Sequence, residues 1–298
     1  MIENMNLPFR WNIAKREQLG RLIDGEADSL LPSFLDAIRI CCTRVLAFCD
    51  DADLVFIGRS PENLFDYFSG ILAPTSWAER CSLVNLALRN LLNATLHSSY
   101  PDVLRSTYPG ALENGREQLD FLDLAPTRIL ARPRPIAFVD LVASGATFQH
   151  LWELLLDWAS EAQLDQAALK RKLRFIGITH QQQTSPKTWR WHQHANWTKE
   201  VRPRAIKNVS IANEVWNYLG NTQTKTMMSN PPWRWGNEQM SVPVRDEASL
   251  QALRRALSLY DLGNTREQRQ RFVREMADGP GMRERWYRGL LQELRRAG

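Results

Sequence analysis

Hydrophobic positions along the chain fall into two kinds of run, which indicate two kinds of secondary structure. Short, mainly apolar runs at 53–57, 136–139 and 174–179 have the length and composition of buried β-strands. Longer segments between and around them carry apolar residues three or four positions apart, as amphipathic helices do. Strands that alternate with helices predict an α/β fold with a mainly parallel sheet flanked by helices.

The predicted helices divide the chain into a core and two helical ends. Helices are expected at residues 13–23, 33–48, 63–72, 78–92, 148–159 and 167–173, with a short strand at 129–130. Residues 1–49 then form a helical N-terminal extension and residues 50–240 an α/β core that contains a Trp-rich segment. Residues 241–298 form an Arg-rich helical C-terminal extension.

One segment, residues 135–147, carries the pattern of a phosphate site. Its apolar strand ends on a single acid, Asp140, and a turn of small residues leads into the next helix. Open α/β sheets bind ligands beyond the carboxyl ends of their strands, where the free amides of a helix N-terminus face an anion. Small side chains let the backbone approach a phosphate, and hydroxyl groups can donate to it. The candidate binding residues are Asp140, Ala143, Ser144, Gly145, Ala146 and Thr147.

A second strand-turn-helix unit lies earlier in the chain. The apolar run 53–57 is followed by Gly58, Arg59 and Ser60, and then by Pro61. Proline favours the first position of a helix and serine its N-cap, so the next helix is expected to begin here. Arg59 and the free amides around Ser60 are suited to bind phosphate or pyrophosphate oxygens.

Composition limits the classes of protein that fit. With 298 residues, 44% hydrophobic and 24% charged, the chain resembles an ordinary soluble protein. No stretch reaches the roughly 18 apolar residues of a membrane span, and the first ten residues lack the apolar centre of a secretory signal. The 4 cysteines lack the spacing of a zinc or redox site, so free thiols in a cytoplasmic protein are expected. No protein ligand set for a metal is predicted.

Two segments each remain open to two interpretations. Residues 245–298 contain many arginines and no lysine, and these either form the solvated faces of amphipathic helices or bind a nucleic-acid or protein partner. Residues 184–235 mix arginines and lysines with six of the 11 tryptophans. These aromatic residues form either a small core against the sheet or a stacking groove for nucleic acid. Solvated helices and an aromatic core are the simpler interpretations.

The segment 138–147 resembles the phosphoribosyl pyrophosphate (PRPP) motif of type I phosphoribosyltransferases. In that motif, an apolar strand leads to two adjacent acids, two apolar or small residues, and a Thr-Gly-Gly-Thr-like loop before a helix. Asp140 matches the second acid, and residues 144–147 match the loop that holds the 5′-phosphate. The turn at 58–60 looks like the pyrophosphate loop of the family. The resemblance covers residues 53–179.

The resemblance implies a type I phosphoribosyltransferase-like fold and an enzyme that transfers the phosphoribosyl group of PRPP to a nitrogenous acceptor, releasing pyrophosphate. It implies that Asp140 orients the ribose, that Arg59 neutralises the leaving group, and that Mg²⁺ is held mostly by substrate oxygens and waters. The family has a mobile loop over the site, for which residues 98–117 are the candidate. Its acceptor-binding hood would come from residues 1–49 or 184–235.

The sequence departs from the family motif at one position. Val139 stands where the first acid of the pair is expected. Some family members with lost or altered catalysis act as PRPP-sensing regulators, so one alternative is a regulator that binds a nucleotide ligand and a nucleic-acid or protein partner. Another is an α/β interaction module without a small-molecule site. The long helical ends also fit a homo-oligomer under each of these hypotheses.

Overall fold

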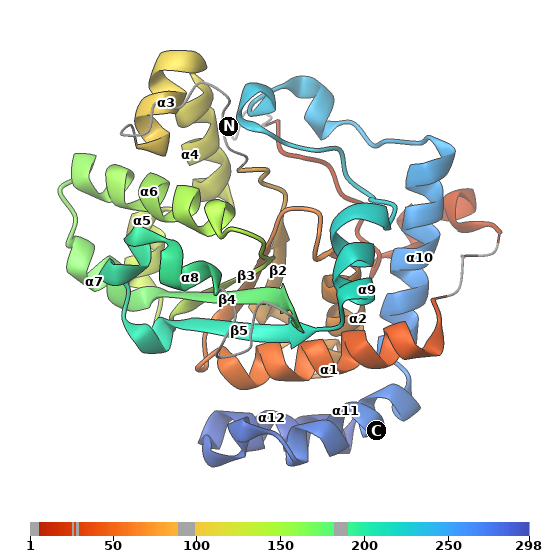
Figure 1. Ribbon diagram of the computed structural model, residues 1–298. Helices are drawn as coiled ribbons and strands as arrows, with labels where there is room; N and C mark the ends of the chain where they lie inside the picture. The colour runs from red at the N-terminus through yellow and green to blue at the C-terminus, as the bar shows by residue number, and fades with distance from the viewer. Residues whose placement is uncertain (1–5, 26, 28–29, 89–98, 182–189, 298) are drawn as a thin grey trace.

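The centre of the molecule is a sheet of parallel strands with helices on both faces (Figure 1). The computed structural model describes residues 6–25, 27, 30–88, 99–181 and 190–297, which contain all the elements named below. The strands are β1 (Asp53–Ile57), β2 (Cys81–Val84), β3 (Ile136–Leu141), β4 (Leu173–His180) and β5 (Ile206–Ile211). They lie in the order β2-β1-β3-β4-β5, and every neighbouring pair is parallel. The predicted α/β fold with a mainly parallel sheet flanked by helices is confirmed.

Three of these strands follow the apolar runs, and two do not. β1, β3 and β4 coincide with the predicted strands. β2 lies within residues 78–92, where a helix was predicted. Residues 78–80 form one 3-10 turn, the prediction is wrong for the described residues 81–88, and residues 89–92 lie outside the described part of the chain. The residues of β2 are extended because their backbone pairs with β1, from Leu54 opposite Cys81 to Ile57 opposite Val84. Pairing with a neighbouring strand overrides the local periodicity here.

The helices surround the sheet and include most of those predicted. They are α1 (Pro32–Phe48), α2 (Glu62–Leu72), α3 (Tyr100–Thr107), α4 (Ala111–Phe121), α5 (Pro126–Ala131), α6 (Ala146–Glu161), α7 (Gln166–Lys172), α8 (Trp191–His194), α9 (Asn213–Asn217), α10 (Glu247–Gly263), α11 (Arg266–Ala277) and α12 (Arg285–Arg296). α1, α2, α6 and α7 correspond to predicted helices. Within the described residues, no helix combines the length and apolar character that a membrane span requires.

Two other short elements differ from prediction. Residues 13–23 form two 3-10 turns, Arg16–Gln18 and Gly20–Ile23, in place of a continuous helix. Gly20, the first residue of the second turn, has a φ of +50°, which a continuous right-handed helix does not allow. The strand predicted at 129–130 is also wrong, because these residues lie in α5, whose first turn begins with Pro126.

One hydrophobic core lies on each face of the sheet. Side chains alternate along the central strands, so Val139 and Ile176 are buried in the first core, whereas Phe138 and Phe175 are buried in the second. Helices α1, α2 and α9 cover the first core, with α11 and α12 beyond α1 (Figure 1). Helices α3 to α8 cover the second. The first core takes Ile38 from α1 and Phe272 from α11, so both helical ends of the chain share the core of the sheet.

α10 packs closely on α2 through two glycines. A Cβ added to Gly70 of α2 would lie 2.0 Å from the carbonyl oxygen of Tyr260, and one added to Gly263 of α10 would lie 2.3 Å from that of Tyr67. The distance between packed helices depends on the side chains at their contact. The absence of a side chain at both positions therefore sets how closely the C-terminal helices approach the core.

We expect Gly70→Ala to destabilise the protein by about 2–3 kcal/mol, because the new methyl group would force the two helix backbones apart. Gly289→Ala on α12 is the matched control, since a Cβ there meets nothing within 4 Å. Alanine has the higher helix propensity, so the control should be neutral or stabilising by up to about 1 kcal/mol. Urea unfolding of both variants measures the difference, and equal effects would contradict this account of the helix contact.

Candidate functional site

The carboxyl ends of β1 and β3 enclose a small polar cavity. In the sheet, β1 has β2 on one side and β3 on the other, so the order of the strands reverses direction at β1. Open α/β sheets bind ligands in the crevice at such a point, beyond the carboxyl ends of the strands. A cavity of about 170 Å³ lies at this position. Its lining includes Gly58, Arg59 and Ser60 after β1, and Asp140 and Thr147 at the junction of β3 and α6. The two predicted turns, distant in the sequence, thus contribute to one cavity.

Hydrogen bonds to neighbouring main-chain carbonyl groups hold the turn after β1 in place. Gly58 has a φ of +77°, which favours glycine, and its N–H donates to the Val84 carbonyl oxygen at 2.7 Å. The Arg59 Nη1 donates to the Met227 carbonyl oxygen at 3.0 Å. α2 begins at Glu62 with Pro61 as its N-cap, one residue later than the serine N-cap predicted from the sequence. These contacts fix the main chain of the turn and the direction of the arginine side chain.

Asp140 is an acid almost fully removed from solvent, with 7% of its surface exposed. The N–H of Leu141 donates to its Oδ1 at 2.7 Å, and the Thr147 hydroxyl also donates to the carboxylate. Burial raises the pKa of Asp140 to about 7, and the two hydrogen bonds offset only part of that effect. An acid with such a perturbed pKa in a cavity marks a candidate functional site.

The raised pKa of Asp140 predicts a pH-dependent cost in stability. In the unfolded chain this carboxyl has its ordinary pKa of 3.8, whereas in the folded protein its pKa is about 7. Between these values the folded state binds more protons, so this group's contribution to stability falls as the pH rises from about 4 to about 7.

We therefore expect Asp140→Asn to be more stable than the wild type at pH 8, by up to about 4 kcal/mol, and similar to it at pH 4. Asn has nearly the same shape and carries no charge, and all other titrating groups are shared by the two proteins. Denaturant unfolding across this pH range measures the difference. A difference that does not change with pH would contradict the raised pKa.

A polar segment that the sequence pattern does not single out, residues 219–230, lies over the cavity. Its residues Gly220, Lys225 and Ser229 complete part of the lining. The Gln223 Nε2 donates to the Ser60 carbonyl oxygen at 2.5 Å, and the Asn85 Nδ2 donates to the Met228 carbonyl oxygen at 2.8 Å. The segment has no apolar periodicity, so only these tertiary contacts identify it as part of the site.

Lys225 places a second cation in the cavity together with Arg59. Its Nζ donates to the Leu219 carbonyl oxygen at 2.8 Å. Burial lowers the pKa of Lys225 to about 7; Glu62 opposes this shift and Arg59 adds to it. Glu62 accepts from the N–H and hydroxyl of Thr226 at 2.8 and 2.7 Å, and burial raises its pKa. An arginine, a lysine that a bound anion would keep protonated, and one acid in a single cavity suit a ligand that carries both phosphate and hydroxyl groups.

The remaining predicted turn residues do not line this cavity. Ala143 and Ser144 are exposed, and Ala146 is the first residue of α6. Gly145 is the N-cap of α6 with a φ of +85°, and a Cβ added to it would lie 2.3 Å from the Trp191 ring. The first-turn amides of α6 have no partners within the helix, as at any helix N-terminus, and Thr147 in this first turn lines the cavity.

The cavity offers few protein ligands for the Mg²⁺ that the family resemblance implies. No three His, Cys, Asp or Glu side chains converge in the described part of the chain. Of the described residues that line the cavity, Asp140 is the only acid. Mg²⁺ keeps several waters and commonly takes one or two carboxylates plus substrate phosphates. The residues present therefore fit an ion that arrives on a phosphorylated ligand, with Asp140 as the available carboxylate.

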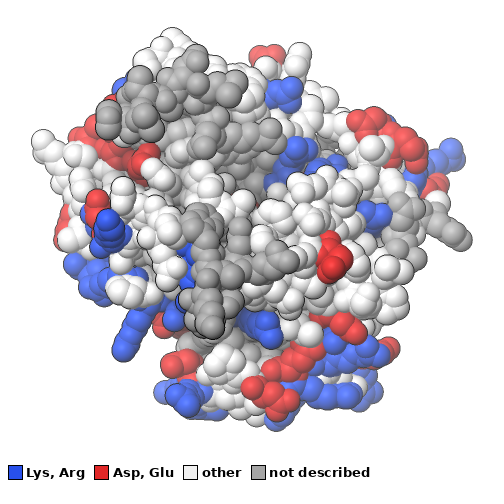
Figure 2. All heavy atoms as spheres, viewed as in Figure 1, with Lys and Arg blue, Asp and Glu red and all other residues white. Residues whose placement is uncertain are grey.

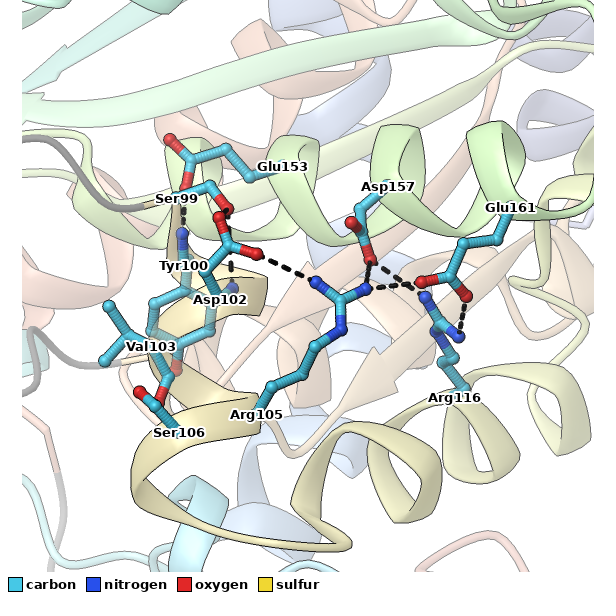
Figure 3. Close-up of polar contacts among 10 residues, drawn as sticks. All are labelled: Ser99, Tyr100, Asp102, Val103, Arg105, Ser106, Arg116, Glu153, Asp157 and Glu161. Carbon is cyan, nitrogen blue, oxygen red and sulfur yellow. Dashed lines mark hydrogen bonds and ion pairs between the residues drawn. The ribbon is translucent and has the colours of Figure 1, made fainter.

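The segment predicted as a mobile loop is largely helical. Residue 98 lies outside the described residues, and residues 99–117 form α3 and the first part of α4. Ser99 caps α3, and two arginines attach the pair of helices to α6 (Figure 3). Arg105 and Arg116 both donate to Asp157, at 2.6 and 2.8 Å, and both also bind Glu161. Both helices also bury apolar side chains in the second core, such as Leu104 and Leu112, so tertiary packing together with these ion pairs holds the segment.

Most described tryptophans of the 184–235 segment belong to the core. Trp191, Trp197 and Trp235 are buried, whereas Trp233 is 52% exposed; Trp189 lies outside the described residues. The rings of Trp191 and Trp197 stack with centroids 6.2 Å apart in the second core. Buried rings cannot stack on a nucleic acid, so these contacts agree with the aromatic-core interpretation.

The arginines of the C-terminal helices are interleaved with acids. Figure 2 shows cationic and acidic side chains alternating over the region where Figure 1 draws α11 and α12. Arg271 pairs with Glu267 at 2.7 Å, and Arg39 of α1 pairs with Glu275 at 2.6 Å. This pattern agrees with solvated helix faces. Because these helices cover the first core, deletion of residues 246–298 would disturb the fold as well as any partner site.

Known proteins offer no direct guide to this cavity. No family model, curated protein or solved structure matches the chain. A functional assignment therefore depends on the convergence of Arg59, Lys225 and Asp140 in one cavity at the reversal of the strand order.

Proposed function

We propose that the protein binds PRPP or a related ribose phosphate in the cavity between β1 and β3, and that it is a type I phosphoribosyltransferase-like enzyme. The convergence of the turn 58–60 with Asp140 and Thr147 is the observation that carries the proposal. In this assignment, Arg59 and Lys225 bind the pyrophosphate group and Asp140 accepts hydrogen bonds from the ribose hydroxyls. Mg²⁺ bound to the substrate would neutralise further charge on the leaving group.

The proposed reaction transfers the phosphoribosyl group to a nitrogenous acceptor. The nitrogen lone pair forms a bond to the anomeric carbon while the bond from that carbon to the pyrophosphate oxygen breaks. Pyrophosphate leaves with the electron pair, and the acceptor nitrogen loses its proton to water. Little covalent chemistry is required of the protein, so positioning of the reactants and neutralisation of the leaving group account for its role.

A second candidate is a regulator that binds PRPP without transferring its phosphoribosyl group. Val139 stands at the position of the first acid of the family motif and is fully buried in the first core, so that Asp140 is the one acid of the pair left to bind the ribose hydroxyls, which favours this alternative. The two candidates differ in turnover: the enzyme releases pyrophosphate when an acceptor base is present, and the regulator does not.

Calorimetric titration of the full chain with PRPP, with and without Mg²⁺, tests the binding shared by both candidates. We expect saturable binding that Mg²⁺ strengthens and that Arg59→Ala weakens at least tenfold, since a charged hydrogen bond contributes roughly 1.5–3 kcal/mol. Arg128→Ala, at an exposed position on α5, is the control for loss of an arginine. Absence of PRPP binding, or equal binding by Arg59→Ala and the wild type, would refute both candidates and leave an interaction module.

A further inference from the structure

The edge of the sheet opposite the cavity, at the amino-terminal ends of β3, β4 and β5, carries a dense group of cations. Residues 128–134, 165–174 and 199–207 lead into these three strands. They contain two acids against 11 cations, which are Arg128, Arg132, Arg134, Lys170, Arg171, Lys172, Arg174, Lys199, Arg202, Arg204 and Lys207. Because the whole chain has a net charge of +5, the rest of the molecule is net negative. The excess positive charge is therefore concentrated in these three segments, which we call the basic edge.

The parallel strand order brings the three segments of the basic edge together. β4 pairs with β3 from its first residue and with β5 from its third, so the three strands begin at nearly the same level. The Lys172 Nζ donates to the Arg132 carbonyl oxygen, and Lys170 pairs with Glu200, so contacts ahead of the strands also join the segments. Figure 2 shows cationic side chains on the side of the molecule where Figure 1 draws α7 and the start of β5.

Acids neutralise one end of the basic edge and leave the other end uncompensated. On the β1 side, aspartates of residues 50–53 pair with Arg132 at 3.0 Å and with Arg174 at 3.3 Å. On the β5 side, Arg202 and Arg204 are exposed, and neither forms an ion pair with any described residue. The guanidinium groups available to an outside anion therefore lie just before β5.

The same tripeptide, Arg-Pro-Arg, precedes both β3 and β5, at residues 132–134 and 202–204. Proline restricts its own backbone and that of the residue before it. Arg202 is accordingly extended, with a φ of −58° and a ψ of 134°, and Pro203 begins a 3-10 turn that ends at Ala205. A guanidinium binds a phosphate through two parallel hydrogen bonds, and a stiff main chain reduces the entropy lost on binding.

The dimensions of the basic edge match the phosphates of a nucleic acid. Neighbouring strands lie about 4.8 Å apart, so the edge spans roughly 10 Å from β3 to β5. One strand of a duplex carries a phosphate about every 3.4 Å along its axis, so about three phosphates can face this edge. Trp197, the tryptophan nearest Arg202 in the sequence, is buried and cannot stack on an unpaired base. These features favour a duplex over a single strand.

The basic edge lacks the apolar groups that a membrane-binding surface requires. The exposed large apolar residues of the described chain all lie outside its three segments; they are Leu31, Ile40, Phe121, Trp233 and Val242. Protein surfaces that bind a bilayer combine cations with apolar side chains that enter the lipid. The edge therefore suits a partner that offers phosphates alone.

We propose that the basic edge binds a nucleic-acid duplex through its phosphates, with Arg202 and Arg204 as the principal contacts. Phosphate contacts carry no sequence information, so binding should not depend on the base sequence, and DNA and RNA duplexes should both bind. This inference is independent of the proposed function, because the basic edge and the cavity lie at opposite ends of the strands.

Fluorescence anisotropy with the full chain and a labelled DNA duplex of about 24 base pairs tests the inference. At about 50 mM salt we expect a dissociation constant in roughly the micromolar range, and a slope of about −3 for log affinity against log salt. The double variant Arg202→Ala/Arg204→Ala should bind at least tenfold more weakly and reduce the magnitude of this slope by about 2. Arg295→Ala/Arg296→Ala is the matched control, since it removes two exposed arginines at the end of α12, and it should change neither quantity.

The stability of the first double variant, measured by urea unfolding, should equal that of the wild type, since both side chains are exposed. The inference would be overturned by absence of duplex binding at low salt, by equal losses in the two double variants, or by displacement of the duplex with excess PRPP. Phosphatidylserine vesicles or polyglutamate that bind as tightly as the duplex would also overturn it. Failure of PRPP itself to bind would refute the proposed function alone.

Discussion

Asp140→Asn is expected to weaken PRPP binding by at least 30-fold at pH 8, where the wild-type carboxyl is ionised. The substitution removes a charged acceptor for the ribose hydroxyls, and charged hydrogen bonds contribute roughly 1.5–3 kcal/mol each. It also removes a carboxylate that burial destabilises, so the same variant should be more stable than the wild type at this pH. Calorimetry with PRPP and Mg²⁺ measures the affinity, and denaturant unfolding measures the stability.

The two readouts together separate a binding role from a structural one. Weaker PRPP binding by a variant that is at least as stable as the wild type cannot come from unfolding, so it indicates a lost contact with the ligand. Asp120→Asn, at an exposed position on α4, is the matched control and should change neither quantity appreciably. If Asp140→Asn binds PRPP as the wild type does, Asp140 is not a ligand-binding residue and the proposed function fails.

Val139→Asp is expected to destabilise the protein by at least about 4 kcal/mol, although it restores the paired acids of the family motif. The side chain of Val139 is fully buried between Phe56 and Ile176, its partners on the neighbouring strands, and belongs to the first core. A carboxylate there has no cation to pair with in that apolar cluster. Thermal or urea unfolding measures the loss.

Val242→Asp provides the control for the same change at a position with 57% exposure, and its effect should stay within about 0.5 kcal/mol. A stable Val139→Asp protein that binds PRPP more tightly than the wild type would show that position 139 reaches the ligand. In that case the departure from the motif would be a simple loss of a binding group. Our structure-based expectation is the opposite, because alternation along β3 directs residues 139 and 140 to different faces.

Much of the fold was predictable because its elements carry strong local patterns. β1, β3 and β4 are short apolar runs, and helices such as α1 and α6 are long and amphipathic. β2 and β5 were missed because edge strands of four and six residues have weak patterns and form by pairing with β1 and β4. The helices at 99–117 were missed because their stability comes from contacts with distant residues, namely burial of Leu104 and Leu112 in the second core and the ion pairs of Arg105 and Arg116 with α6.

The candidate site likewise contains some residues that were predictable from the sequence and others that were not. Arg59, Asp140 and Thr147 lie at or just after the ends of apolar strands, so the sequence identified them as residues that could bind a phosphorylated ligand. Lys225 stands in a polar segment without periodicity, so its place in the cavity became visible only in the folded chain.

The sequence by itself determined the class of fold and the two strand-turn-helix units, because apolar runs, turn residues and helix signals act over a few neighbouring positions. Only the tertiary structure decided that the two turns share a cavity, that Lys225 joins them, and that Val139 faces the core. It also decided the raised pKa of Asp140, since that shift comes from burial. Strand order, burial and charge pairing all depend on contacts between residues far apart in the chain, which no local pattern encodes.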